Sequence, residues 1–343
     1  MTTGVLRLTD VIVPAVFTPM VRRLSIEKSV FIASGAAVQD ASLNAFLAGA
    51  GLTVNMPRGA VLDTSDVENV SSDDPTVFST PNKFNEAVEI AVRLSRNNSW
   101  SDMDLVSALL GRDPMANIAE AVAAYWTARR ERAFISHLAG IFANNATATD
   151  AYHVQNDMTR DVSGASYSAG VTGFGGGAFI DAQLTMGDAM DTLTLILMHP
   201  VVYAAARKQN MITFIQPSAV DPAIPTYQGA RVIISDKMPS PASGVFESWL
   251  LGAGAFLYGT GSPQIPTEVL RIPAAGNGGG QDVMHDRVEW AMHVPGTAYV
   301  GTPPNGGPSN AATTNNIAAA ASWRRVATDR RYVKIARVIT REY

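Results

Sequence analysis

The longest uninterrupted helical pattern in this sequence is the stretch DPMANIAEAVAAYWTARRERAFISHLAGIFAN at residues 113–144. Asp113 can cap a helix, and Pro114 suits the first helical position, where its missing N–H removes no hydrogen bond. Apolar residues then recur at helical spacing from Ile118 to Phe142. At 1.5 Å per residue the stretch predicts a helix of roughly 48 Å, much longer than the average helix of about 11–12 residues.

Upstream of this helix, two alternating runs predict a pair of strands. Residues 52–57 alternate apolar and polar side chains, and residues 84–94 do the same, although the second run also fits a helix. A compact domain seldom has a connection of about 25 residues without another element. We therefore interpret 49–99 as a long two-stranded ribbon with an acidic tip. Since an isolated ribbon is marginal in water, it needs a neighbouring subunit to lie on. The acidic residues between the runs are Asp63, Asp66, Glu68, Asp73 and Asp74.

The amino-terminal segment, residues 1–48, reads as an arm that contains one short helix. Two prolines forbid a continuous helix there, but Val21 to Phe31 falls at helical spacing. A further short helix is expected after the ribbon, capped by Ser101 and ended by Gly111.

From residue 178 onward, helical and strand patterns alternate, which is typical of a sheet covered by helices. A glycine-rich tip at 276–280 separates two of the strands. The expected helices cover 178–191, 199–209 and 317–323; the expected strands cover 193–198, 232–234, 269–272, 283–294 and 332–339; and 248–257 is a strand or a hairpin.

The composition excludes several classes of protein. The chain has 343 residues, no cysteine and a formal net charge of −4. Thiolate chemistry and iron–sulfur clusters are therefore excluded, and no overall basic charge marks a nucleic-acid binder. Only 16% of the residues are charged, against roughly 25% in ordinary soluble chains, which indicates oligomerisation. The apolar run at 249–258 is far shorter than the ~20 residues of a membrane helix, and residues 1–30 show no signal-peptide pattern, so we expect a protein without a membrane partner that is kept in a cytosol.

The sequence contains no motif for catalysis, so we expect no catalytic, cofactor-binding or metal site. No glycine precedes a lysine, which excludes a Walker loop, and no Gly-x-Ser-x-Gly elbow occurs. The acidic run lacks the spacing of an EF-hand calcium loop. No two histidines lie three or four residues apart, so we interpret them as packing or capping residues. They are His137, His153, His199, His285 and His293.

The stretch from Ser322 to the carboxyl terminus carries seven basic residues against two acidic ones. Two interpretations stay open: contact with nucleic acid, or pairing with the acidic ribbon of another subunit. The basic residues are Arg324, Arg325, Arg330, Arg331, Lys334, Arg337 and Arg341.

Several local motifs, taken in their order along the chain, resemble the major capsid proteins of tailed bacteriophages. The resemblance covers nearly the whole chain, and it depends on the order of the motifs because none of them is specific alone. The motifs are LTDVIVP at 8–14, TVNMP at 53–57, MHPVVY at 198–203, TYQGARVI at 226–233, DKMP at 236–239 and SWRRV at 322–326.

This resemblance implies a mixed α/β capsid fold and a structural role without enzymatic activity. Subunits of this family assemble through hexamers and pentamers into the icosahedral head that encloses double-stranded phage DNA. The implied parts are an amino-terminal arm at 1–48, an extended β-ribbon loop at 49–99, a peripheral domain at 100–177 and 263–305 with the spine helix at 113–144, and an axial domain at 178–262 and 306–343.

The resemblance also implies partners and a location. Because the arm begins at once, the resemblance implies either a separate scaffolding protein or a removed propeptide. The other implied partners are a portal, a possible decoration protein, and packaged DNA contacted without sequence specificity. The location is the virion, assembled in the cytoplasm of the bacterial host. Some relatives lock their shells with an isopeptide bond from a lysine of the extended loop; no lysine lies between residues 29 and 82, which implies a non-covalent shell.

Two alternatives to a phage head stay open at this point. An encapsulin-type nanocompartment has the same fold but encloses protein cargo. An oligomeric cytosolic enzyme is the alternative from a different class, and it lacks a convergent set of catalytic residues in this sequence.

Overall fold

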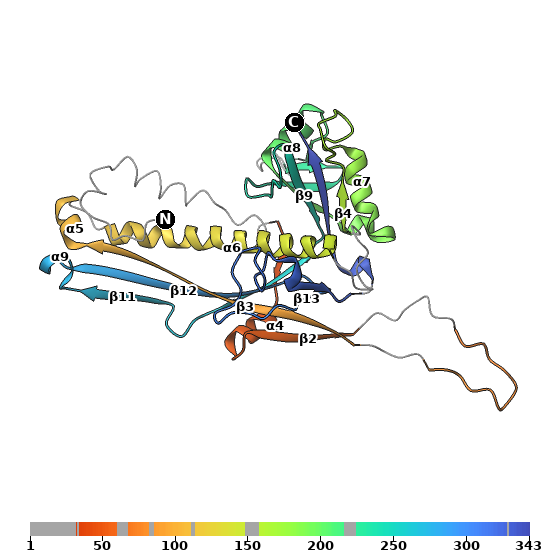
Figure 1. The fold of residues 1–343 in the computed structure, drawn as a ribbon, viewed down its shortest axis with the longest axis horizontal. Coiled ribbons are helices and arrows are strands. Elements are labelled where there is room, and N and C mark those ends of the chain that lie inside the picture. Colours follow the sequence, from red (N-terminus) through yellow and green to blue (C-terminus); the bar gives the residue numbers. More distant parts are fainter. Residues whose placement is uncertain are drawn as a thin grey trace.

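A computed structural model describes residues 32, 34–59, 68–81, 86–110, 114–147, 158–215, 224–327 and 329–343. The short helix expected at 21–31 lies outside these residues. The described chain forms two mixed β-sheets and one long helix, and a loop projects from one end of the molecule (Figure 1).

The long helix α6 spans Pro114–Thr147 and confirms the helix predicted at 113–144. It runs above the long strands of the first sheet and reaches the base of the second sheet (Figure 1). Phe134, Leu138 and Phe142 are fully buried. Because these side chains are four residues apart, they form a single apolar stripe along the helix.

Gly140 lies where α6 crosses the carboxyl-terminal part of the chain. A Cβ atom at this position would lie 2.1 Å from the carbonyl oxygen of Ile317 and 2.7 Å from Nε1 of Trp323. The Trp323 indole N–H donates to that carbonyl at 2.7 Å. Only a glycine allows the helix to approach this closely.

The strand β3 (Glu86–Met103) is the central strand of the first sheet. It pairs antiparallel with β2 (Thr53–Gly59) near the loop and with β12 (Gln281–His293) over the remainder. The strand predicted at 52–57 is therefore confirmed, and the described part of the run at 84–94, from Glu86 onward, is a strand rather than a helix. The paired segments of β3 adjoin at Val92, so only the half nearer the loop forms a ribbon with β2.

The helix expected from Ser101 begins later than predicted. The strand β3 continues to Met103, which pairs with Gln281 of β12, so Ser101 belongs to the strand. The helix α5 then covers Asp104–Leu110. The other elements of this sheet are β1 (Ala37–Gln39), β10 (Phe256–Gly261), β11 (Thr267–Ile272), β13 (Thr297–Tyr299) and β14 (Trp323–Arg325), flanked by α4 (Ala41–Ala48) and the short α9 (Ala275–Gly278).

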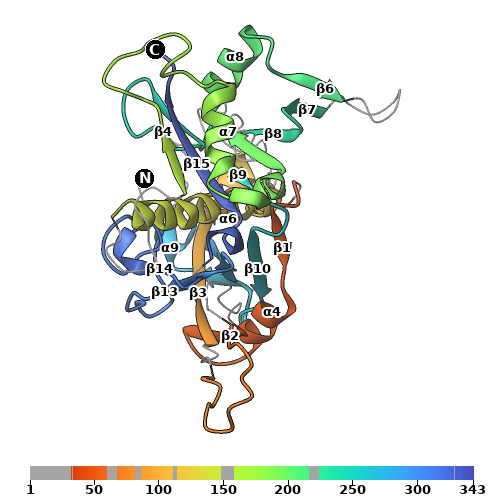
Figure 2. The same cartoon turned by 90° about the vertical axis from the view of Figure 1, so that its right-hand side faces the viewer.

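The second sheet has seven strands in the order β4-β15-β9-β5-β8-β7-β6. Figure 2 shows β4 and β15 at one side of this sheet and the β6–β7 hairpin projecting at the other. The predicted helices and strands of this region are confirmed in type, with two differences. The helix predicted at 178–191 ends at Leu184 and is followed by a separate 3-10 helix, and the strand predicted at 332–339 begins at Ile335. Its strands are β4 (Thr159–Asp161), β5 (Leu195–Met198), β6 (Thr213–Ile215), β7 (Ile224–Tyr227), β8 (Ala230–Ile234), β9 (Val245–Leu251) and β15 (Ile335–Arg341); its helices are α7 (Gly176–Leu184), η1 (Gly187–Thr192), α8 (Pro200–Lys208) and η3 (Arg330–Tyr332).

The stretch at 248–257 is neither one strand nor a hairpin. The strand β9 ends at Leu251 in the second sheet, and β10 begins at Phe256 in the first sheet. Trp249 and Phe256 are fully buried on either side of this crossing. The apolar run therefore joins two sheets, which its local pattern does not reveal.

The helix predicted at 317–323 is wrong. One 3-10 turn, η2 (Ala320–Ser322), leads directly into β14. The alanines favour a helix, but the N–H of Ile317 donates to the carbonyl of Ser309 at 3.0 Å, and that of Ala318 donates to Ala311 at 3.2 Å. These contacts between distant residues override the local helical preference.

A continuous apolar core joins α6 to both sheets. Leu94 and Phe256 of the first sheet, Trp249 of the second sheet and Phe142 of α6 belong to the same buried cluster. A second cluster lies between the second sheet and the helices α7 and α8. The sheets and the helix therefore form one packed body.

Candidate assembly surfaces

Two of the described histidines have the packing or capping role that was predicted, whereas His293 instead pairs with the buried carboxylate of Glu89 at 2.8 Å. Nδ1 of His199 accepts the N–H of Val201 at 3.2 Å and caps α8, as predicted. His137 is fully buried against Phe256 and Trp323, and burial holds its pKa well below the usual value of 6.5. His153 lies outside the described residues. Within the described ranges, no group of His, Asp and Glu side chains could hold a metal ion, and no helix is long and apolar enough to cross a membrane.

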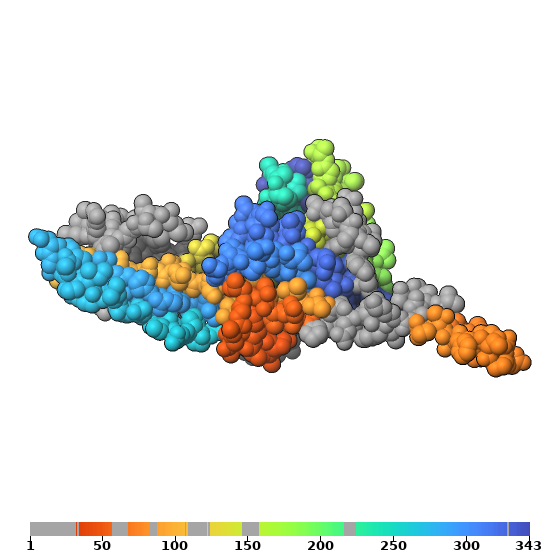
Figure 3. Space-filling view, turned by 60° about the horizontal axis from the view of Figure 1, so that its bottom comes forward, coloured from red at the N-terminus to blue at the C-terminus, as the bar shows by residue number. Residues whose placement is uncertain are grey.

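The end of the ribbon, residues 68–81, is here called the loop tip. It projects beyond the rest of the molecule (Figure 3, orange), and all of its residues are exposed. The Asn69 amide donates to the carbonyl of Thr80 at 3.1 Å and accepts the Thr80 N–H at 3.3 Å. The Asp74 carboxylate accepts the Thr76 hydroxyl at 2.7 Å and the Thr76 N–H at 2.8 Å, and these two hydrogen bonds lower the pKa of Asp74. The loop tip therefore has its own internal hydrogen bonds.

Apolar side chains lie among the acidic ones on the loop tip. Val70 and Phe78 are 87% and 85% exposed, and Val77 is 60% exposed. A cluster of exposed apolar residues commonly marks a site of protein–protein contact. The charge pattern alone missed these residues, although Val77 and Phe78 are adjacent in a polar stretch. Of the predicted acidic residues, Glu68, Asp73 and Asp74 lie on the loop tip, whereas Asp63 and Asp66 lie outside the described residues.

The basic residues near the carboxyl terminus serve mainly contacts within the chain. Arg337 is buried, and its guanidinium lies 3.2 Å from the Glu247 carboxylate. Arg330 donates to the carbonyl of Val333 and, at 2.5 Å, to that of Ile335. Arg325 is buried, and Arg341 donates to the carbonyls of residues 163, 164 and 243. The basic residues of the final strand, Arg337 and Arg341, therefore do not form a free basic face. Arg324 and Lys334, which precede this strand, are exposed.

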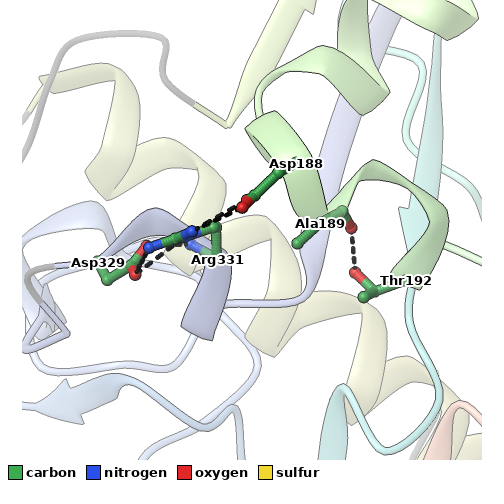
Figure 4. Close-up of polar contacts among 5 residues, drawn as sticks. All are labelled: Asp188, Ala189, Thr192, Asp329 and Arg331. Carbon is green, nitrogen blue, oxygen red and sulfur yellow. Dashed lines mark hydrogen bonds and ion pairs between the residues drawn. The ribbon is translucent and has the colours of Figure 1, made fainter. Parts of the chain in front are cut away.

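Arg331 connects two carboxylates at the surface (Figure 4). Its guanidinium lies 3.0 Å from Asp188 of η1 and 2.7 Å from Asp329. Beside it, the Thr192 hydroxyl donates to the carbonyl of Ala189 and closes the end of η1. The single positive charge of Arg331 thus pairs with two carboxylates, which leaves this group with one net negative charge.

The body described above is packed around α6, and a loop whose apolar side chains are exposed to solvent projects from it.

Comparison with known proteins identifies the family. No protein-family model matches the chain. The chain is 36% identical over 334 residues to the major capsid protein of Bacillus phage SPP1, with 93% of this chain and 94% of that protein covered. Its fold is similar to the capsid of Ralstonia phage GP4, with a TM-score of 0.50, 10% identity, and coverage of 85% of this chain and 84% of that chain. The chain also matches the cyanophage Pam1 capsid, with a TM-score of 0.49, 11% identity and 86% of each chain covered. The 36% identity over nearly the full length of both chains shows that this chain belongs to the major capsid proteins of tailed phages.

Family membership confirms the resemblance inferred from the sequence motifs. The protein is a subunit of the icosahedral phage head, a virion component and not an enzyme. This family membership excludes the two alternatives, an oligomeric enzyme and an encapsulin-type compartment.

Proposed function

We propose that this subunit assembles with its copies into hexamers and pentamers, and that the loop tip holds neighbouring subunits together. The observation that carries this proposal is the exposure of Phe78, Val70 and Val77 on a loop that projects from the body. Covering an apolar side chain of this size contributes about 1.5–3 kcal/mol. A neighbouring subunit would remove all three side chains from water.

The internal hydrogen bonds of the loop tip support this role. Because Asn69 is bonded to Thr80 and Asp74 to Thr76, the tip loses less conformational freedom when it docks. Its carboxylates contribute little energy at the surface, about 0–1 kcal/mol for each ion pair, so they select the position of docking more than its strength.

The proposal assigns the parts of the chain as the family relationship implies. The arm is 1–48, the extended loop is 49–99, the peripheral domain is 100–177 with 263–305, and the axial domain is 178–262 with 306–343. Three short strands do not follow these ranges. β4 lies within 100–177 but pairs in the second sheet, whereas β10 and β14 lie within 178–262 and 306–343 but pair in the first sheet.

The proposal includes partners that act at successive stages of head formation. A separate scaffolding protein guides assembly, a portal occupies one vertex and a decoration protein binds the finished shell. The packaged DNA is contacted without sequence specificity. Because strong general binding to DNA requires an excess of basic residues, the net charge of −4 leads us to expect that this contact is weak.

The test changes the loop tip in two ways, by a deletion and by substitution of its apolar side chains. Deletion of 58–78, and the triple substitution Val70→Ser, Val77→Ser and Phe78→Ser, should leave folded subunits that no longer form shells in electron micrographs. Val171→Ser is the matched control, because Val171 is 68% exposed on a different part of the chain. Normal shells from the triple variant would contradict the proposed role of the loop tip.

A further inference from the structure

One edge of the second sheet carries an apolar and basic surface, here called the edge patch. It consists of Arg207, Lys208, Phe214 and Ile215. Phe214 and Ile215 are 52% and 57% exposed on β6, the outer strand of the sheet. The Arg207 guanidinium at the end of α8 lies 5.9 Å from the centre of the Phe214 ring, and Lys208 beside it is exposed. An uncovered edge strand with apolar side chains is a surface that proteins usually cover.

A second surface, here called the helix patch, lies on α7 and η1. Ile180 and Leu184 are one helical turn apart and 46% and 61% exposed. The exposed carboxylates of Asp188 and Asp191 follow in η1. Asp188 shares the guanidinium of Arg331 with Asp329, so this part of the patch keeps a negative charge.

The two patches do not cover each other within one chain, because the apolar side chains of both are exposed. The helix α7 packs across the face of the sheet, from β15 and β4 to Tyr227 of β7, whereas β6 forms the sheet edge. Both patches combine apolar side chains with charge, and the charges are of opposite sign. The edge patch of one copy is therefore complementary to the helix patch of another.

We propose that the edge patch of one subunit docks on the helix patch of the next, in a head-to-tail contact that closes each capsomer into a ring. Contacts of this type join different surfaces of identical subunits and form rings when the rotation closes. The inference rests on the proposed assembly through hexamers and pentamers. It names the surfaces that meet within each ring, whereas the loop tip is not part of it.

The absence of cysteine allows a direct test by cross-linking. The double variant Leu184→Cys/Phe214→Cys is assembled, treated with a bifunctional maleimide and examined on a denaturing gel. We expect a ladder of covalent oligomers that ends at five and six subunits. Each single variant should give no species beyond a dimer, because one thiol can join only two chains.

A matched control separates docking from random collision. Leu184→Cys/Ile265→Cys places the second thiol on an equally exposed residue before β11, outside the edge patch, since Ile265 is 54% exposed. This variant should give no ladder. A second pair, Ile180→Cys/Ile215→Cys, repeats the test on the same two patches if the first pair does not fold.

The outcomes separate this inference from the proposed function. Particles that form normally but give no ladder with either pair would overturn the docking of the two patches and leave the proposed assembly intact. An equal ladder from the control would overturn it as well. Failure of the unmodified chain to form shells would instead contradict the proposed function.

Discussion

The Nε2 atom of His293 lies 2.8 Å from a carboxylate oxygen of Glu89, and both side chains are buried. The other carboxylate oxygen accepts the N–H of Gly296 at 2.8 Å. Glu89 belongs to the part of β3 that pairs with β2, opposite Met56, and His293 ends β12. This pair therefore fixes the base of the extended loop to the end of a long strand of the body.

Removal of the Glu89 carboxylate should destabilise the subunit strongly. Glu89→Ala leaves the His293 ring and the Gly296 N–H buried without this acceptor, and loss of one partner of a buried pair costs about 3–5 kcal/mol. Glu89→Gln keeps an acceptor oxygen and should lose less. Chemical denaturation of the three proteins measures the differences in the free energy of unfolding. Equal values for all three proteins would show that the Glu89 carboxylate contributes nothing to stability.

Gly140→Ala distinguishes helical preference from packing. In an exposed helix this substitution would stabilise by about 1 kcal/mol. Here the added Cβ would lie 2.1 Å from the Ile317 carbonyl oxygen, so we expect a loss of about 1–3 kcal/mol. Thermal unfolding, with an alanine-to-glycine change at the exposed Ala204 of α8 as a control, gives the sign. A higher melting temperature for Gly140→Ala would contradict the close approach.

Gly140 also illustrates how far the sequence could predict this fold. The long helix and the ribbon strands were predictable because their periodicity is local. The contact of Gly140 with Trp323 is not local, and it belongs to the packing that prevents a helix at 317–323. The crossing between β9 and β10 likewise depends on pairing with residues 37–39 and 289–293. On the loop tip, the acidic residues were recognised from charge, whereas the exposure of Phe78 required the structure.

His137 should make the stability of the subunit depend on pH. It is buried against Phe256 and Trp323, and burial, followed by the charge of His293, holds its pKa well below 6.5 in the folded state. In the unfolded chain this histidine binds a proton as the pH falls through 6.5, whereas the folded chain does not. The contribution of His137 to the free energy of unfolding should therefore be unchanged above pH 6.5. Below that pH the free energy of unfolding should fall, by up to about 2 kcal/mol at pH 5.

The variant His137→Leu isolates this contribution. The other titratable groups nearby, His293 and Glu89 with Asp40 further along the same network, stay unchanged in it. Denaturation at pH 8 and pH 5 should show a smaller loss for the variant than for the unmodified protein. The same loss in both proteins would contradict the assignment of this pH dependence to His137.

The last prediction concerns how the finished shell is held together. An isopeptide bond requires a lysine amine that can lose its proton and attack a side-chain amide, and an arginine cannot replace it because it stays protonated. The chain has lysines only at 28, 83, 208, 237 and 334, and no cysteine for a disulfide. Lys237 pairs with Glu131 of the same chain at 3.3 Å, and the described loop tip carries no lysine.

We therefore expect a non-covalent shell, stabilised by apolar contacts such as those of Phe78. Mature particles boiled in detergent should give a single band at 36.4 kDa on a denaturing gel. A ladder of covalent oligomers would contradict this expectation, and Lys83→Arg would then show whether Lys83 supplies the amine.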